Sequence, residues 1–385
     1  LMTGRHPGRF GRHATVPSNA PVLPDNYYTL AHLFRDAGYA TGLFGKWHLG
    51  SDPRHGPYYF GFDYSYGSFA GGVDPYSHLY KPGPFVKTWH RNGTPVDEPG
   101  HVTDLITDEA VQWIERQTSP FFCYLPFTAV HTPIRPPEAW IDRYDDAAPF
   151  DDPEKNEAFR RYAAYTSHMD QAVGRLLEAL DRMGQREDTI IVFSSDNGAI
   201  NDSPLHGTDK YPGWQEAYPR LGSNLPFRGV KAQLYEGGIR TPTLVNWRGH
   251  LDAATMDHPV QVTDWMPTFT NLVGAAPAAD PRYDGRDIWP LITGAQRSPE
   301  PRRFFWNFRG DAHLGVREGD WKLIVRQADG GRHYELFNIA EDPYEETDRA
   351  DELPDKVRQL EAAIEEERRQ DGTSARTDVH SPGVN

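Results

Sequence analysis

An acidic and an amide residue, Asp196 and Asn197, follow the apolar run of residues 189–193 in the stretch TIIVFSSDNG. The run lacks the alternation of a half-buried strand, which is typical of a strand buried on both faces of a parallel sheet. In open α/β folds, ligands bind beyond the carboxyl ends of such strands. Carboxylate and amide oxygens are hard ligands that suit Ca²⁺ or Mg²⁺. The pair therefore indicates a metal site, although Asp-Asn-Gly is also common in plain tight turns.

Two basic side chains, Lys46 and His48, lie two positions apart in a strand expected over residues 40–49. Residues two apart in an extended segment point the same way, so these two share a face and Trp47 takes the opposite one. Basic groups backed by packed apolar residues make an anion site. An exposed edge strand with scattered charges is the alternative interpretation.

Two further basic residues are candidates for the same edge. His131 stands just past a second apolar run, residues 120–127, and is therefore expected on the same side of the sheet as Asp196. An imidazole there can transfer protons, although a lone loop histidine is more often just a hydrogen-bonding residue. Lys231 lies between a Pro- and Gly-rich loop and a strand expected over residues 241–247.

The elements that position these residues alternate between helix and strand. Apolar periodicity predicts helices over residues 29–38, 103–117, 160–183 and 262–274. His168, in the third of these, is expected to be exposed or to cap a neighbour. Such alternation favours an α/β fold with a mostly parallel sheet flanked by helices. After about residue 299, short strands separated by turns predict a smaller antiparallel sheet, followed by a helix from Leu353. We therefore expect two units, residues 1–298 and 299–385.

Composition narrows the partners. The 385 residues carry a net charge of −15, which argues against a nucleic-acid partner. No apolar run approaches ~18 residues, so no membrane partner is expected. The single cysteine, Cys123, lies in an apolar run, where core packing is its expected role, and one cysteine excludes an internal disulfide.

Several of these segments together resemble the sulfatase family. They occur in the family's order along nearly the whole chain: LMTGR (1–5), GKWHLG (45–50), AVHTP (129–133), SSDNG (194–198), GVKAQLYEGGIRTP (229–242) and ELFN (335–338). The stretch NLPFRGVK (224–231) is most similar to the arylsulfatase B branch.

The resemblance implies an alkaline-phosphatase-like α/β fold and the hydrolysis of a small-molecule or glycan sulfate ester. It assigns Asp196 and Asn197 to a divalent cation, usually Ca²⁺ with Mg²⁺ as the alternative. Lys46, His131 and Lys231 become sulfate-binding residues, and His48 becomes an acid/base partner. In the family a formylglycine, made from cysteine or serine by a formylglycine-generating enzyme or maturase, attacks the sulfur. The family resemblance also implies export to the periplasm or the extracellular space.

This sequence departs from the family pattern at its start. The formylglycine is expected upstream of Leu1, about seven residues back along the motif. The strand that carries the family's paired aspartates is likewise expected upstream. We therefore expect an N-terminally truncated chain that is inactive alone. The alternatives are a phosphate or phosphonate ester hydrolase of the same superfamily and a non-catalytic binder of sulfated glycans.

Overall fold

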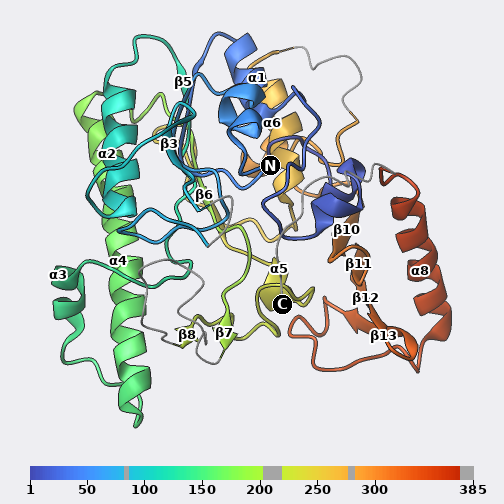
Figure 1. The fold of residues 1–385 in the computed structure, drawn as a ribbon. Helices are drawn as coiled ribbons and strands as arrows, with labels where there is room; N and C mark the ends of the chain where they lie inside the picture. The colour runs from blue at the N-terminus through green and yellow to red at the C-terminus, as the bar shows by residue number, and fades with distance from the viewer. Residues whose placement is uncertain (82–85, 203–218, 276–281, 373–385) are drawn as a thin grey trace.

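The computed structural model describes residues 1–81, 86–202, 219–275 and 282–372. A central mixed sheet lies between two groups of helices, and a second sheet with its own helix stands to one side (Figure 1). None of the helices within these ranges is both long enough and apolar enough to cross a bilayer. The expected α/β class is therefore observed, with a sheet that is mixed rather than mostly parallel.

The central sheet has the strand order β4-β3-β2-β1-β5. Its strands are β1 (Ala40–Lys46), β2 (Tyr64–Ser68), β3 (Trp89–Arg91), β4 (Thr94–Pro95) and β5 (Phe121–Tyr124). Strand β1 runs parallel to both of its neighbours, β2 and β5. The outer strands β3 and β4 add on in antiparallel fashion, each as a hydrogen-bonded neighbour of the strand before it.

Strand β1 is the buried centre of this sheet. Leu43 packs into the apolar cluster on the side of α1 (Leu30–Asp36), whereas Phe44 packs into the cluster on the side of α2 (Val102–Glu115). Both side chains are fully buried. Alternate side chains of a strand point to opposite faces, so β1 joins the two halves of the core.

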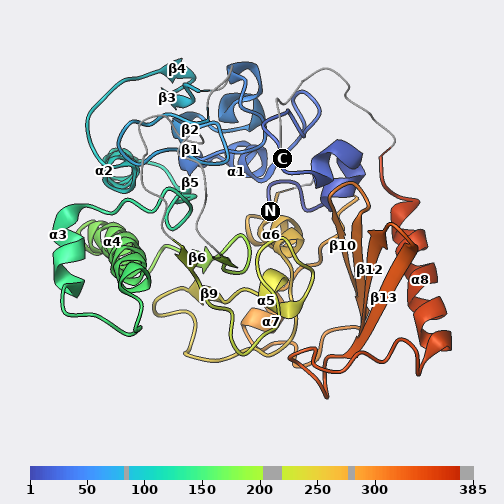
Figure 2. The same ribbon diagram turned by 60° about the horizontal axis from the view of Figure 1, so that its bottom comes forward.

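The remaining helices cover the faces of the sheet. Helix α4 (Pro153–Arg182) packs along α2, with Asp152 accepting hydrogen bonds from its first turn. Helix α6 (Trp265–Leu272) lies with α1 on the other side (Figures 1 and 2). The shorter helices are α3 (Glu138–Ile141), α5 (Glu236–Ile239) and α7 (Trp289–Ile292), with 3-10 turns at Pro7–Phe10, Arg12–Thr15, Pro53–His55, Pro57–Phe60, Asp142–Tyr144 and Val262–Asp264.

One expectation about the strands was wrong. Strand β6 (Ile191–Ser194) pairs antiparallel with β9 (Thr243–Asn246) in a separate two-stranded sheet, and neither face of β6 is fully covered. Phe193 is 42% exposed and Leu244 is 65% exposed. The apolar run correctly predicted a strand, but local sequence could not show that its second edge lacks a paired neighbour among the described residues. A further short pair is formed by β7 (Asn201–Asp202) and β8 (Arg220–Leu221).

The second sheet is antiparallel, as expected. Its strands β10 (Arg303–Phe308), β11 (His313–Glu318), β12 (Trp321–Ala328) and β13 (Gly331–Asn338) follow one another in order. Helix α8 (Pro354–Arg368) lies against its outer face (Figure 2). The boundary at residues 298 and 299 stays a prediction. Residues 373–385 of the second expected unit, and residues 203–218 of the Pro- and Gly-rich loop before Lys231, lie outside the described residues.

Candidate active site

The candidate residues come from four segments that end near one another. Lys46 is the last residue of β1, and His131 lies in the loop after β5. Asp196 and Asn197 follow β6, and Lys231 lies in the loop before α5. The strand expected over residues 40–49 ends at Lys46, because His48 has a φ of 58°, outside the extended region.

Charged groups from three of these segments interact. The Nζ atom of Lys46 lies 3.8 Å from Oδ2 of Asp196. Burial lowers the pKa of Lys46, the charge of Asp196 opposes this shift, and the charge of Lys231 adds to it. The structure thus brings together residues separated by more than a hundred positions in the sequence.

Four charged side chains act on His48. Its pKa is lowered to about 3, first by burial and then by the positive charges of Lys46, His131 and Lys231, against the negative charge of Asp196. These four side chains are therefore within electrostatic reach of one imidazole. At neutral pH this imidazole is uncharged, and its low pKa makes it a weak base as long as no anion balances the neighbouring positive charges.

Packing fixes the position of His48. The neighbouring Trp47 is 5% exposed, its ring lies 5.6 Å from that of Phe60, and its Nε1 donates to the carbonyl of His55 at 2.9 Å. The expectation that Trp47 points into the core is thus confirmed. On the other side, a Cβ atom at Gly71 would lie 2.2 Å from Nε2 of His48, so no larger residue fits there without displacing the imidazole.

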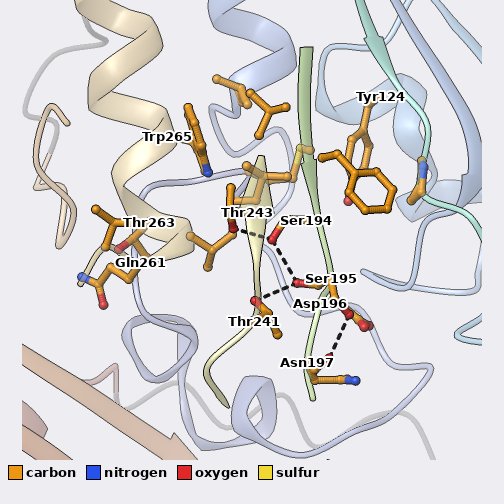
Figure 3. Close-up of a pocket in the computed structure, with 18 of the residues that line it drawn as sticks. Tyr124, Ser194, Ser195, Asp196, Asn197, Thr241, Thr243, Gln261, Thr263 and Trp265 are labelled. Carbon is orange, nitrogen blue, oxygen red and sulfur yellow. Dashed lines mark hydrogen bonds between the residues drawn. The ribbon is translucent and has the colours of Figure 1, made fainter. Parts of the chain in front are cut away.

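The segment after β6 presents its polar atoms at the edge of a cavity (Figure 3). The Ser195 hydroxyl donates to the carbonyl of Asn197 at 2.8 Å, and the Ser194 and Thr243 hydroxyls lie 2.8 Å apart. The Asn197 amide donates to the carbonyl of Gly198 at 3.0 Å, which leaves its Oδ1 atom as the available acceptor. The side chain of Asp196 is 71% exposed.

These oxygen donors fit part of a calcium site. One carboxylate and one amide oxygen are the right chemistry for a hard cation, and the exposure of Asp196 leaves room for one. Calcium takes six to eight oxygen ligands, so these two residues would hold the ion together with further groups. The nearby Lys46 ammonium balances part of the charge of Asp196. A bound cation would replace Lys46 as the partner of Asp196 and leave the ammonium for another anion.

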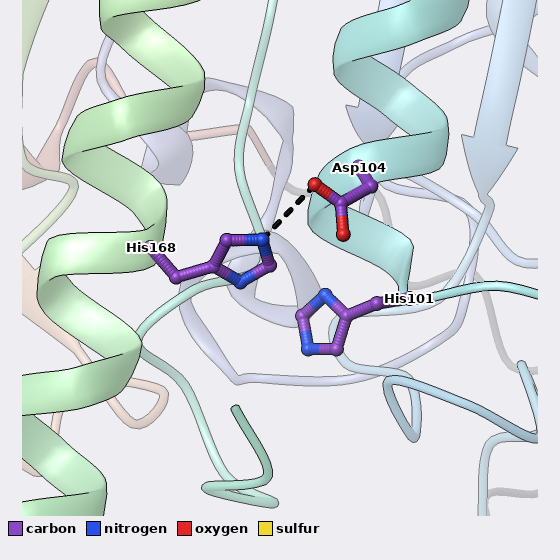
Figure 4. Close-up of side chains that lie close together, drawn as sticks. All are labelled: His101, Asp104 and His168. Carbon is purple, nitrogen blue, oxygen red and sulfur yellow. Dashed lines mark hydrogen bonds and ion pairs between the residues drawn. The ribbon is translucent and has the colours of Figure 1, made fainter. Parts of the chain in front are cut away.

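A second group of possible metal ligands lies between α2 and α4 (Figure 4). The ligand atoms of His101, Asp104 and His168 all lie within 4.8 Å of one another. However, both ring nitrogens of His101 are engaged, Nδ1 by the Thr103 N–H and Nε2 by the carbonyl of Arg135. Oδ1 of Asp104 accepts from Nε2 of His168. We therefore interpret the group as a buried support for the loop that carries His131.

His168 was expected to be exposed or capping, and this expectation was wrong. It is 2% exposed, with its ring close to those of His101 and Trp140. The periodicity of α4 places residue 168 beside the apolar stripe, but the partner Asp104 comes from a different helix. A sequence pattern within one helix therefore carried no signal for this contact.

A cavity of about 3190 Å³ extends from the candidate residues between β5 and β6. In the part of the chain that the structure describes, β5 is the edge of the central sheet and β6 pairs with β9 alone. Tyr124 of β5 and Asp196 border the same opening (Figure 3). Burial first, and then the charge of Asp196, raise the pKa of Tyr124 to about 12.

Comparison with known proteins identifies the family. A family model described as Sulfatase matches residues 1–275, well over half of the chain. The chain belongs to the sulfatase family. A second model, N-sulphoglucosamine sulphohydrolase, C-terminal, matches residues 230–370. The family expected from the motifs is therefore confirmed.

Individual relatives of this sulfatase-family chain agree. N-acetylgalactosamine-6-sulfatase of Canis lupus familiaris is 30% identical over 345 residues, which cover 84% of this chain and 60% of the relative. Arylsulfatase J of Mus musculus is 28% identical over 418 residues, covering 94% and 65%. The chain thus spans about 60% of the length of the first of these curated relatives.

A solved structure shows the same fold. The crystal structure of Ps i-CgsB in complex with k-i-k-neocarrahexaose superposes with a TM-score of 0.80 at 28% identity, covering 97% of this chain and 81% of that one. The alkaline-phosphatase-like architecture expected from the resemblance is therefore the observed one, with a mixed central sheet and a separate C-terminal sheet.

Proposed function

We propose that the protein is a sulfatase that hydrolyses sulfate esters of carbohydrates. The observation that carries the proposal is the group of Lys46, His48, His131 and Lys231 around Asp196, seen as mutual electrostatic effects on His48. Fixed cations in a partly buried site stabilise the negative charge that develops as a sulfate ester is cleaved. Relatives named as sulfatases of a sugar, or solved in complex with an oligosaccharide, support the carbohydrate part.

Each side chain has a distinct proposed role. Lys46, His131 and Lys231 bind the sulfate oxygens, because they supply positive charge around one point. His48 is the proposed acid/base partner: it is neutral at working pH, and a bound sulfate that counters the neighbouring positive charges would raise its basicity. Asp196 and Asn197 would hold Ca²⁺, or Mg²⁺, which would supply further positive charge to the sulfate. A formylglycine, installed by a generating enzyme or maturase, would supply the nucleophile.

The open edges of β5 and β6 support a further part of the proposal. Among the described residues, the facing edges of these two strands have no paired strand and border one cavity, which suits a strand inserted between them. We propose that residues beyond these 385 fill this place and bring the nucleophile and the remaining metal ligands.

Export of the protein is proposed from the family alone, and fractionation of cells that express the natural gene tests it.

Binding to the 385-residue chain tests the central claim. We expect N-acetylgalactosamine 6-sulfate to bind in the presence of Ca²⁺, measured by calorimetry, and the unsulfated sugar to bind far more weakly. Lys46→Ala and His131→Ala should each weaken binding about tenfold or more, a loss of about 1.4 kcal/mol. Lys155→Ala, on the exposed start of α4, is the matched control.

The protein that the natural gene encodes should be assayed for activity, because its activity distinguishes the proposed sulfatase from the two alternative functions. Hydrolysis of a sulfated sugar at a rate well above that of a phosphonate ester supports the sulfatase. Preference for the phosphonate would replace it with the superfamily alternative. If that protein binds the sulfated sugar but does not hydrolyse it, then it is a glycan-binding protein instead.

A further inference from the structure

A buried ionic cluster joins the C-terminal sheet to the candidate active site. Nζ of Lys322, the second residue of β12, lies 2.8 Å from Oε1 of Glu236 and 2.8 Å from Oε1 of Glu345. Lys322 and Glu345 are 0% exposed and Glu236 is 4% exposed. The three residues come from a strand, the first position of α5 and a loop after β13.

Both carboxylates of the cluster have partners. Beyond the two ion pairs, the backbone N–H of Glu236 donates to Oε2 of Glu345 at 2.6 Å. Nη1 of Arg240 lies 3.8 Å from Oε2 of Glu236, so two cations, Lys322 and Arg240, face the two carboxylates of the cluster. Buried ion pairs add little net stability compared with apolar packing, but they fix the relative position of the segments that carry them. Such a cluster therefore suits a positioning role.

The short helix α5 contacts the metal-ligand segment through its backbone. The N–H of Gly198, the residue after Asn197, donates to the carbonyl of Gly238 at 3.0 Å. A Cβ atom at Gly198 would lie 1.8 Å from the carbonyl oxygen of Gly237, so the two backbones are in direct contact. Any shift of α5 therefore moves the segment that carries Asp196 and Asn197.

The loop before α5 contacts the same segment from its other end. The N–H of Lys231 donates to the carbonyl of Ala199 at 3.0 Å. The side chain of Asn224 bridges Ala199 and Gly229 through hydrogen bonds of 2.7–3.0 Å. Lys231 and the Asp196–Asn197 pair are thus held by one interlocked unit, and Glu236 ties this unit to the C-terminal sheet.

We propose that Lys322, Glu236 and Glu345 are positioning residues that hold the Asp196–Asn197 segment and Lys231 in register for their ligands. The inference rests on the proposed function for the identity of those ligands. The mechanical link, from Lys322 through α5 to Gly198, rests on the contacts alone. The C-terminal sheet is then a part of the active-site scaffold.

The test compares two buried ion pairs. Lys322→Met removes the cation of the cluster, and Arg302→Met removes the cation paired with Asp264, which is also fully buried but does not contact the Asp196–Asn197 segment. Both variants should lower the melting temperature. Amide exchange by NMR should accelerate at Gly198 by about tenfold or more in Lys322→Met and stay near wild type in Arg302→Met.

Ligand binding gives the second readout. Calorimetric affinities for Ca²⁺ and for inorganic sulfate should fall about tenfold in Lys322→Met and little in Arg302→Met. Where Lys322→Met does not fold, Glu236→Gln keeps an acceptor for Lys322 and is compared with Asp264→Asn in the same way.

The outcomes separate the inference from the proposed function. Equal Gly198 exchange in the two matched variants would overturn the positioning role. If exchange at Gly198 is faster in Lys322→Met but the wild-type protein binds neither Ca²⁺ nor sulfate, then the positioning role stands and the proposed function is wrong.

Discussion

His48 shows how burial and charge set the chemistry of a single residue. Burial is the largest cause of its low pKa, and three neighbouring cations add to it. The imidazole is therefore kept neutral by the same cations that are proposed to bind sulfate. A bound sulfate would counter those charges and make protonation easier, which couples anion binding to proton uptake.

Removing one of the cations should therefore raise the pKa of His48. We expect this in Lys46→Met, because the Lys46 charge is the largest electrostatic contribution after burial. NMR titration of the His48 ring measures it, with Lys155→Met as the control far from the group. Added sulfate should shift the wild-type pKa in the same direction. An unchanged titration in Lys46→Met would mean that the two side chains do not interact in solution.

The elements differ in how far they could be predicted. The proximity of Lys46, His48 and Asp196 could be predicted because each lies in a short local motif next to an apolar run. Strand β6 was also found, but its half-exposed state was not, because burial depends on pairing between distant segments. The Lys322–Glu236 contact spans 86 positions, so no local pattern in one sequence carries it.

The contact between α5 and the Asp196–Asn197 segment leads to a prediction at this scale. Gly198→Ala should lower the free energy of unfolding by about 1–3 kcal/mol, because its Cβ has to displace the backbone of Gly237. Gly174→Ala, in open space within α4, should instead raise it by about 0.5–1 kcal/mol. Urea unfolding measures both. If Gly198→Ala is as stable as wild type, then the tight contact does not exist in solution.

Three histidines with lowered pKa values make the stability of the whole molecule depend on pH. The pKa values of His48 and His90 are lowered to about 3 and that of His101 to about 4, in each case chiefly by burial. These groups stay neutral in the folded protein while the unfolded chain takes up protons below about 6.5. Each group should therefore reduce the free energy of unfolding by about 1.4 kcal/mol per pH unit as the pH falls from 6.5 toward its folded value.

Urea unfolding between pH 7 and pH 4 measures this slope. His90 is the residue to change, because it is 1% exposed, stacks on Phe69 at 3.7 Å and takes no part in the proposed site. His90→Phe should make the slope shallower over this range. An identical slope in the variant would show that His90 is protonated in the folded protein.

Turnover requires a nucleophile, and the described residues gather binding groups without an activated one. The hydroxyls nearest Asp196 are held by other partners, Ser195 by the carbonyl of Asn197 and Ser194 by Thr243. The thiol of Cys123 is only partly buried, but removal from solvent raises its pKa to about 12, so a thiolate does not form at neutral pH.

We therefore expect the 385-residue chain to bind a sulfated sugar without hydrolysing it. Its rate with 4-nitrophenyl sulfate, followed by absorbance in the presence of Ca²⁺, should equal that of a Lys46→Ala, His131→Ala double variant. The natural protein that also contains the proposed inserted strand should hydrolyse this ester faster than both chains by several orders of magnitude, because covalent catalysis and charge stabilisation then act together. A rate of the 385-residue chain clearly above that of the double variant would place the nucleophile among these residues and remove the proposal that it lies outside them.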